Sequence, residues 1–210
     1  MNKRNYQKEL EALMAQNARE GRRPRLLLHV CCAVCASYVL EYLHRDFDIT
    51  IAYYNPNITE EAEYRYRYSE LRRYVEEAGL GEDIRFIEVE YDPQSFLERS
   101  KGHETDREGG ARCALCFQQR LAYTARLCKE GGYDLFATTL TISPLKNAEV
   151  INAIGEKVGI EIGAQYLCTD FKKREGYKRS IELSKKYDLY RQNYCGCGFS
   201  KREAQERDAK

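Results

Sequence analysis

Residues 26–35 of this 210-residue chain read LLLHVCCAVC. The apolar run that opens this stretch is typical of a buried strand, and two cysteines follow where that strand is expected to end. Similar runs alternate with helix-like patterns along the chain, which predicts an α/β fold with a parallel sheet. The expected strands cover 26–30, 49–53, 84–89 and 135–139, and the expected helices cover 36–45, 59–79, 112–129 and 146–157.

In a sheet of this class, ligands bind beyond the carboxyl ends of the strands. The first expected strand ends at Cys31 and Cys32, the second runs into 54–57 and the fourth into 138–144. We therefore expect these three loops to meet at one crevice. From about residue 170 the chain is expected to form a helical, cysteine-containing extension that folds back over this crevice.

We expect residues 24–210 to form a single α/β domain, preceded over 1–23 by an amphipathic helix to which we assign no function. The chain has 34 Lys and Arg against 33 Asp and Glu, so its formal charge is only +1. Contact with nucleic acid would therefore come from a local basic patch. Neither a signal peptide nor a membrane span is expected, because the apolar runs are too short. We expect a cytoplasmic protein, whose thiols stay reduced.

Seven of the nine cysteines fall in three short clusters. These are Cys31, Cys32 and Cys35, then Cys113 and Cys116, then Cys195 and Cys197. Structural zinc takes four thiolates, so this number favours an iron–sulfur cluster with a second centre, although the spacing leaves zinc open. We interpret the other two cysteines, Cys128 and Cys168, as small buried hydrophobic residues.

The stretch CAVC alone also permits a thioredoxin-like redox turn, because the amino end of a helix favours the thiolate. That interpretation leaves the other cysteine clusters unexplained. Glycine-rich fingerprints for dinucleotides and for P-loop nucleotides are absent from the sequence. Further along, Lys172, Lys173 and Lys178 alternate with aromatic residues and are expected to contact phosphates, unless they form an ordinary solvated face.

Several motifs occur together and in order between about residues 25 and 202. They are HVCCAVC, YNPNI, RCALC, TTLTISPLKN, the stretch DFKK with the following GY, and LYRQNYCGCGFS. In this combination the chain resembles the QueH family of epoxyqueuosine reductases. The resemblance implies a Rossmann-like fold similar to the adenine nucleotide α-hydrolases, with the cysteine turn in place of a glycine-rich loop. It also implies reduction of epoxyqueuosine to queuosine at the wobble base of tRNA.

The resemblance further implies a [4Fe-4S] cluster, a nearby mononuclear iron, tRNA as partner and an electron donor that the sequence does not identify. We expect the cluster to take its ligands from a pool of five cysteines, with the remaining pair, Cys31 and Cys35, on the second iron. That pool consists of Cys32, Cys113, Cys116, Cys195 and Cys197. Cys35 and Asp170 are the candidate catalytic residues, although Asp170 is equally suited to capping a helix. Tyr54, Asn55 and Asn57 are expected to bind the modified base.

Two other functions fit parts of the pattern. In one, the cysteines hold structural zinc in a nucleic-acid-binding protein. In the other, the protein is a thiol–disulfide oxidoreductase that uses Cys35 and has no need of Cys195 and Cys197.

Overall fold

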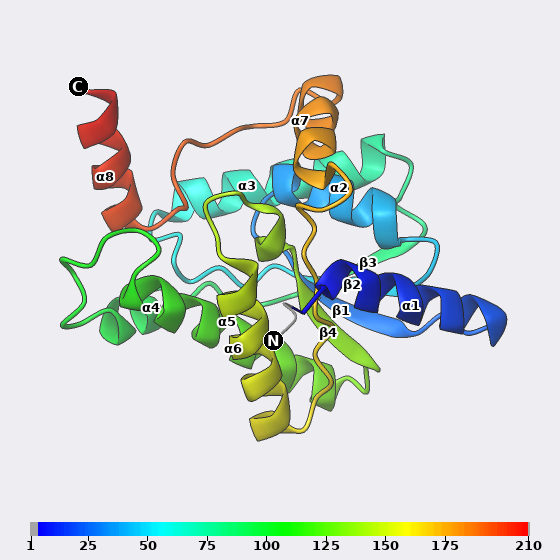
Figure 1. The fold of residues 1–210 in the computed structure, drawn as a ribbon. Helices are drawn as coiled ribbons and strands as arrows, with labels where there is room; N and C mark the ends of the chain where they lie inside the picture. Colours follow the sequence, from blue (N-terminus) through cyan, green and yellow to red (C-terminus); the bar gives the residue numbers. More distant parts are fainter. Residues whose placement is uncertain (1–3, 210) are drawn as a thin grey trace.

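The computed structural model describes residues 4–209 and shows an α/β fold built on a four-stranded parallel sheet (Figure 1). Its strands are β1 (Arg25–His29), β2 (Asp48–Ala52), β3 (Ile84–Ile87) and β4 (Leu135–Thr138), in the spatial order β3-β2-β1-β4. The central strand β1 pairs in parallel with both β2 and β4. The expected α/β class and all four expected strands are confirmed, with small shifts at the strand ends.

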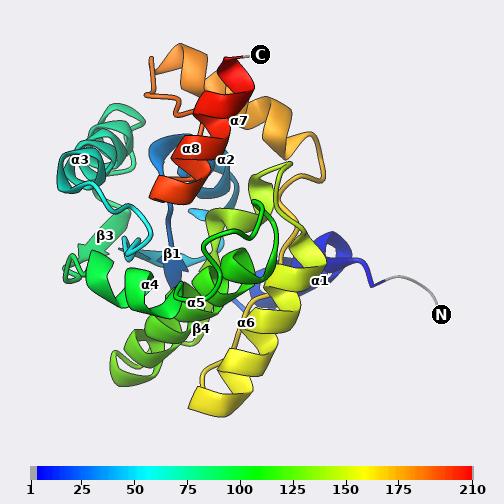
Figure 2. The same cartoon turned by 90° about the vertical axis from the view of Figure 1, so that its left-hand side faces the viewer.

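The helices cover both faces of this sheet (Figure 2). They are α1 (Tyr6–Arg19), α2 (Ala33–Leu43), α3 (Glu61–Glu77), α4 (Pro93–Arg99), α5 (Ala111–Glu130), α6 (Ala148–Ile162), α7 (Gly176–Lys186) and α8 (Gly198–Asp208), with a short 3-10 helix, η1 (Thr139–Ile142). The sequence did not predict α4 or η1. Both are too short for a helical period, and α4 carries only local signals, a Pro93 start and an Asp92 side chain that accepts from Ser95 N.

Successive residues of β1 point to opposite faces of the sheet and divide the interior into two cores. Leu26 and Leu28 pack with residues of α1, α2, α3 and α7, whereas Leu27 packs with residues of α5 and α6. The first core includes Leu10 of α1, which is completely buried. The expected amphipathic helix near the N-terminus is thus present and packs on the domain.

The chain after residue 170 returns to the edge where the strands end. Helix α7 packs against α2, and its first residue must be glycine because a Cβ at Gly176 would collide with the carbonyl of Phe171 and the ring of Tyr38. Helix α8 lies beside the loop between α4 and α5, where Glu203 accepts from Glu108 N at 3.1 Å. No helix in the described part of the chain is long and apolar enough to cross a membrane.

Candidate metal centre

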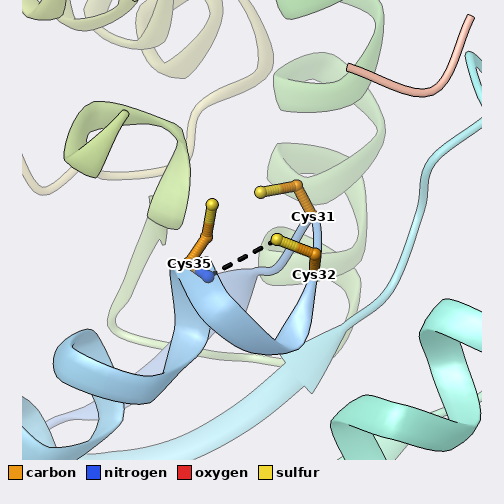
Figure 3. A group of neighbouring side chains, drawn as sticks. All are labelled: Cys31, Cys32 and Cys35. Carbon is orange, nitrogen blue, oxygen red and sulfur yellow. Dashed lines mark hydrogen bonds between the residues drawn. The ribbon is translucent and has the colours of Figure 1, made fainter. Parts of the chain in front are cut away.

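Cys31, Cys32 and Cys35, which we call the cysteine trio, lie at the junction of β1 and α2. Cys32 is the N-cap residue of α2, and its Sγ accepts from Cys35 N at 3.4 Å (Figure 3). The three Sγ atoms all lie within 4.8 Å of one another. Figure 3 shows the three side chains converging on a common space above the first turn of α2. This arrangement can bind a single metal ion.

The ionisation of the trio supports metal binding. Hydrogen bonds from Cys32 and then Cys35 hold the pKa of Cys31 well below its usual value. The hydrogen bond with Cys31, together with burial, raises the pKa of Cys32, and hydrogen bonds with Cys31 and Cys32, together with burial, raise the pKa of Cys35. Without a cation only one of the three sulfurs is readily ionised, because like charges this close oppose each other. A bound cation would favour the ionised form of all three, which is the chemistry of a thiolate metal site.

The cysteine tetrad, Cys113, Cys116, Cys195 and Cys197, comes from two distant parts of the chain. All four residues line one cavity of about 120 Å³, which we call the tetrad cavity. Two of them lie in the first turns of α5, and Cys197 is the N-cap residue of α8, where its Sγ accepts from Ser200 N at 3.3 Å. Within the described residues, the trio is the only group of three or more Cys, His, Asp or Glu whose donor atoms all lie within 4.8 Å of one another. The tetrad sulfurs are therefore spread more widely around their cavity.

Gly196 lets the tetrad form. Its φ of +124° favours glycine, and a Cβ there would lie 2.8 Å from Ile58 Cγ1. The turn between Cys195 and Cys197 can therefore pack directly on the loop after β2.

A second cavity, of about 290 Å³, adjoins the tetrad cavity, and we call it the trio cavity. It is lined by the cysteine trio, by Tyr177 and Ser180 of α7, and by residues 191–195. Four residues line both cavities, namely Glu108, Leu145, Lys146 and Cys195. The C-terminal segment thus folds over the crevice as expected, and the two cysteine groups lie on either side of a shared wall.

Two cations stand beside the thiols. Burial opposes the charge on the half-buried Lys146, yet the neighbouring Cys195, Cys31 and Cys35 raise its pKa overall. Burial likewise opposes the charge on Arg120, but Cys116 and other thiols raise its pKa. The Nη1 atom of Arg120 lies 3.9 Å from the Sγ of Cys116. Both cations therefore offset negative charge on the sulfurs.

Arg120 also contacts His29, which is completely buried, through Nε at 3.2 Å from Nε2. Burial, followed by the charge of Arg120, lowers the pKa of His29 to about 3. The imidazole is therefore neutral. Its Nδ1 lies 2.8 Å from Thr138 Oγ1, and its Nε2 also lies 3.1 Å from the carbonyl oxygen of Tyr54.

The three residues expected to bind the base follow β2, as predicted, but they differ in surroundings. Tyr54 is buried and stacks on Tyr123 with ring centroids 3.7 Å apart. Asn55 is buried and accepts from Arg120 Nη2 at 2.6 Å. Neither lines the trio cavity or the tetrad cavity. Asn57 does line the tetrad cavity, and its Oδ1 has no hydrogen-bond partner among the described residues.

The remaining predicted residues lie outside the two cysteine cavities. Asp170 pairs with Lys172 Nζ at 3.1 Å and accepts from Lys172 N, a position that supports capping of the local turn. Lys172 Nζ also donates to Thr141 O at 2.9 Å. Lys173 and Lys178 are exposed, and Lys178 pairs with Glu175. Cys128 and Cys168 are buried and belong to neither cysteine group, as expected.

Sequence reasoning missed three cations of the site, Arg67, Arg120 and Lys146. Arg120 lies shortly after the RCALC motif, and Lys146 belongs to the TTLTISPLKN motif. The signal that could have identified them was their position, next to candidate cysteine ligands and after an expected strand. Arg67 lies on α3, whose alternating Tyr and Arg residues gave no such signal.

The fold and site define a Rossmann-like α/β protein whose thiols can bind metal. A family model described as "Epoxyqueuosine reductase QueH" matches residues 26–203. This chain belongs to the QueH family.

Several relatives named "Epoxyqueuosine reductase QueH" match along most of the chain. The relative from Staphylococcus epidermidis is 43% identical over 200 residues, which cover 93% of this chain and 84% of the relative. The relative from Streptococcus pyogenes is 42% identical, covering 93% of this chain and 78% of the relative. The relative from Thermotoga maritima is 32% identical, covering 88% of this chain and 94% of the relative. The resemblance drawn from the motifs is confirmed.

Proposed function

We propose that this protein reduces epoxyqueuosine to queuosine at the wobble position of tRNA, the last step of queuosine synthesis. The name shared by its relatives supports this activity. The observation that carries the proposal is the gathering of seven thiols, from three separate stretches of chain, around two adjoining cavities. Replacing an epoxide by an alkene takes up two electrons and two protons and releases the oxygen as water, and a thiol-bound metal centre can deliver the electrons.

The two cysteine groups suit two different metal centres. A [4Fe-4S] cluster needs widely spaced thiolates because each thiolate ends on a different iron, and the tetrad thiols are distributed around one cavity without three of them gathering within 4.8 Å. The trio, with its sulfurs within 4.8 Å, suits a single iron. This proposal places Cys32 and Cys35 with Cys31 on the second iron, whereas the sequence-based expectation placed Cys32 in the cluster pool. When bound, these centres would supply electrons one at a time and a Lewis acid for the epoxide oxygen.

The chain itself supplies charge and shields the reaction from water. Negative charge grows on the epoxide oxygen as its carbon–oxygen bond breaks, and a cation already in place stabilises that charge. Lys146 lines both cavities and is held in its charged form by neighbouring thiols. Phe96 and Phe117 line the tetrad cavity and shield the thiols there from water. We leave Asp170 out of this mechanism because it lines neither cavity.

The substrate in this proposal is a tRNA, contacted through the exposed Lys173 and Lys178, of which Lys178 directly follows Tyr177 of the trio cavity. The electron donor is a separate reductant. Both reduced thiols and tRNA are found in the cytoplasm, and we place the reaction there.

The deciding experiment is anaerobic reconstitution with iron and sulfide, followed by an absorption spectrum and metal analysis. We expect a brown protein with iron in excess of sulfide, which converts epoxyqueuosine in tRNA to queuosine when a chemical reductant is added. Mass spectrometry of digested tRNA would show the loss of one oxygen. A colourless protein that holds stoichiometric zinc and leaves the tRNA unchanged would contradict the proposal and favour the structural zinc alternative.

A further inference from the structure

Two residues that line the trio cavity carry polar atoms that the protein leaves without partners. The cavity volume of about 290 Å³ leaves room for a substituent much larger than an ion. Arg67 and Gln192 both line this cavity. Within the described residues, Arg67 Nη2 and Gln192 Oε1 are buried and have no hydrogen-bond partner.

Arg67 is fixed in place on three sides. Its Nε pairs with Glu63 at 2.7 Å, its Nη1 donates to Cys195 O at 3.2 Å, and its guanidinium lies 5.0 Å from the ring centre of Tyr194. The side chain is only 2% exposed. A rigidly held guanidinium keeps one remaining donor, Nη2, at a defined position. Leaving such a buried donor unpaired costs stability, so a partner is expected to satisfy it when the cavity is filled.

Gln192 supplies the complementary group. It lies in the segment 191–195 that walls the cavity, and its Oε1 is an acceptor. One fixed donor and one acceptor on the same wall recognise a group that carries both an oxygen acceptor and an O–H or N–H donor. A phosphate would satisfy the arginine but would face repulsion from the glutamine oxygen.

We propose that Arg67 and Gln192 bind the epoxide-bearing group of the modified base and thereby distinguish modified tRNA from unmodified tRNA. Arg67 Nη2 donates to an oxygen of that group, and Gln192 Oε1 accepts from one of its O–H or N–H groups. The trio lines the same cavity, so this binding places the epoxide beside Cys31, Cys32 and Cys35. The inference rests on the proposed function and assigns recognition to residues away from Tyr54 and Asn55.

The test uses Arg67→Lys and Gln192→Leu in the reconstituted protein, with two tRNAs that differ only in whether the wobble base is epoxyqueuosine or guanine. Arg67→Lys keeps the positive charge but removes the guanidinium donor, and Gln192→Leu removes the acceptor with little change in volume. Losing one such hydrogen bond should weaken affinity for the modified tRNA by about tenfold, and more for the charged donor. Affinity for the unmodified tRNA and the iron content should not change.

Gln165→Leu is the matched control for Gln192→Leu, because Gln165 is exposed and lines neither cysteine cavity. It should preserve the preference for modified tRNA. Loss of preference in Gln192→Leu, with unchanged iron, supports the inference even if Arg67→Lys folds poorly. If Gln192→Leu keeps the preference for modified tRNA, the inference about recognition is overturned. The proposed function still holds in that case, provided that the unsubstituted protein converts epoxyqueuosine to queuosine. If the iron-loaded unsubstituted protein neither converts nor prefers modified tRNA, the proposed function itself fails and the inference fails with it.

Discussion

Arg120 donates from Nη2 to Oδ1 of Asn55 across 2.6 Å, and both side chains are buried. Asn55 also donates from Nδ2 to Val30 O at 2.8 Å. These two bonds connect α5, which carries Cys113 and Cys116, to the end of β1, which carries the trio. The relative position of the two cysteine groups therefore depends on a polar contact between two residues that bind no metal.

We predict that Asn55→Leu lowers the free energy of unfolding by about 1–3 kcal/mol, because it leaves part of a buried guanidinium unpaired. Urea denaturation of the metal-free protein would measure this. The exposed Gln165 gives a control, since Gln165→Leu should change stability by no more than about 0.5 kcal/mol. A normal stability with a raised KM for tRNA would instead show that Asn55 binds the base, as the sequence first indicated.

The tetrad should be indispensable for the cluster. Cys113→Ala and Cys197→Ala remove thiols from different segments of chain around one cavity, so each should abolish bound sulfide, visible absorption and activity. Cys128→Ala is the control, because Cys128 is buried in the core between α5 and α6 and should cost only about 1 kcal/mol of stability. Loss of sulfide from the Cys128 variant would show that the cysteines are divided wrongly.

The trio should hold a separate iron. In Cys32→Ala we expect about one iron per chain to be lost while sulfide and the visible absorption remain, because Cys32 Sγ lies within 4.8 Å of Cys31 and Cys35. Parallel iron and sulfide analyses decide this. If sulfide is lost as well, Cys32 is a ligand of the cluster, as expected from the sequence.

Contact with tRNA should depend on the exposed lysines near α7. We predict that Lys173→Glu combined with Lys178→Glu weakens tRNA binding and makes its salt dependence shallower, by about one to two units in the slope of log K against log salt. Lys172 is left unchanged because its ammonium already bonds to Thr141 O. Lys157→Glu, an equally exposed charge reversal on α6, should have little effect. If both variants weakened tRNA binding equally, Lys173 and Lys178 would belong to an ordinary solvated surface and not to a tRNA-binding site.

The sequence predicted the parallel sheet and the meeting of loops at its carboxyl edge because both follow from local patterns and one topological rule. It could not separate Arg65 from Arg67. Both lie in the same alternating stretch, yet Arg65 is exposed and pairs with Glu61, whereas Arg67 is buried against Cys195. Which of the two arginines faces the site depends on the orientation of α3 relative to the segment around Cys195, which is 128 residues away in the sequence.

Tyr54 shows the same limit. Its position after β2 correctly placed it at the ligand-binding edge of the sheet, but its ring is taken up by Tyr123 of α5. That pairing is a tertiary contact, and no spacing within the sequence encodes it. The sequence thus located the site more reliably than it identified the side chains that are free to act there.

Helix α8 has a consequence for how metal supply acts on this protein. Its buried residues are Ser200 and Ala204. It is attached through the Cys197 cap, through Glu203 to the α4–α5 loop, through the Lys201–Glu60 ion pair and through Phe199, which packs on Phe96. A segment with few buried residues opens locally at low free energy. Metal bound by Cys195 and Cys197 would therefore stabilise α8 and the residues just before it in their folded positions. Residues 191–195 also wall the trio cavity. By thermodynamic linkage, metal at Cys195 and Cys197 and a ligand in the trio cavity would then strengthen each other's binding.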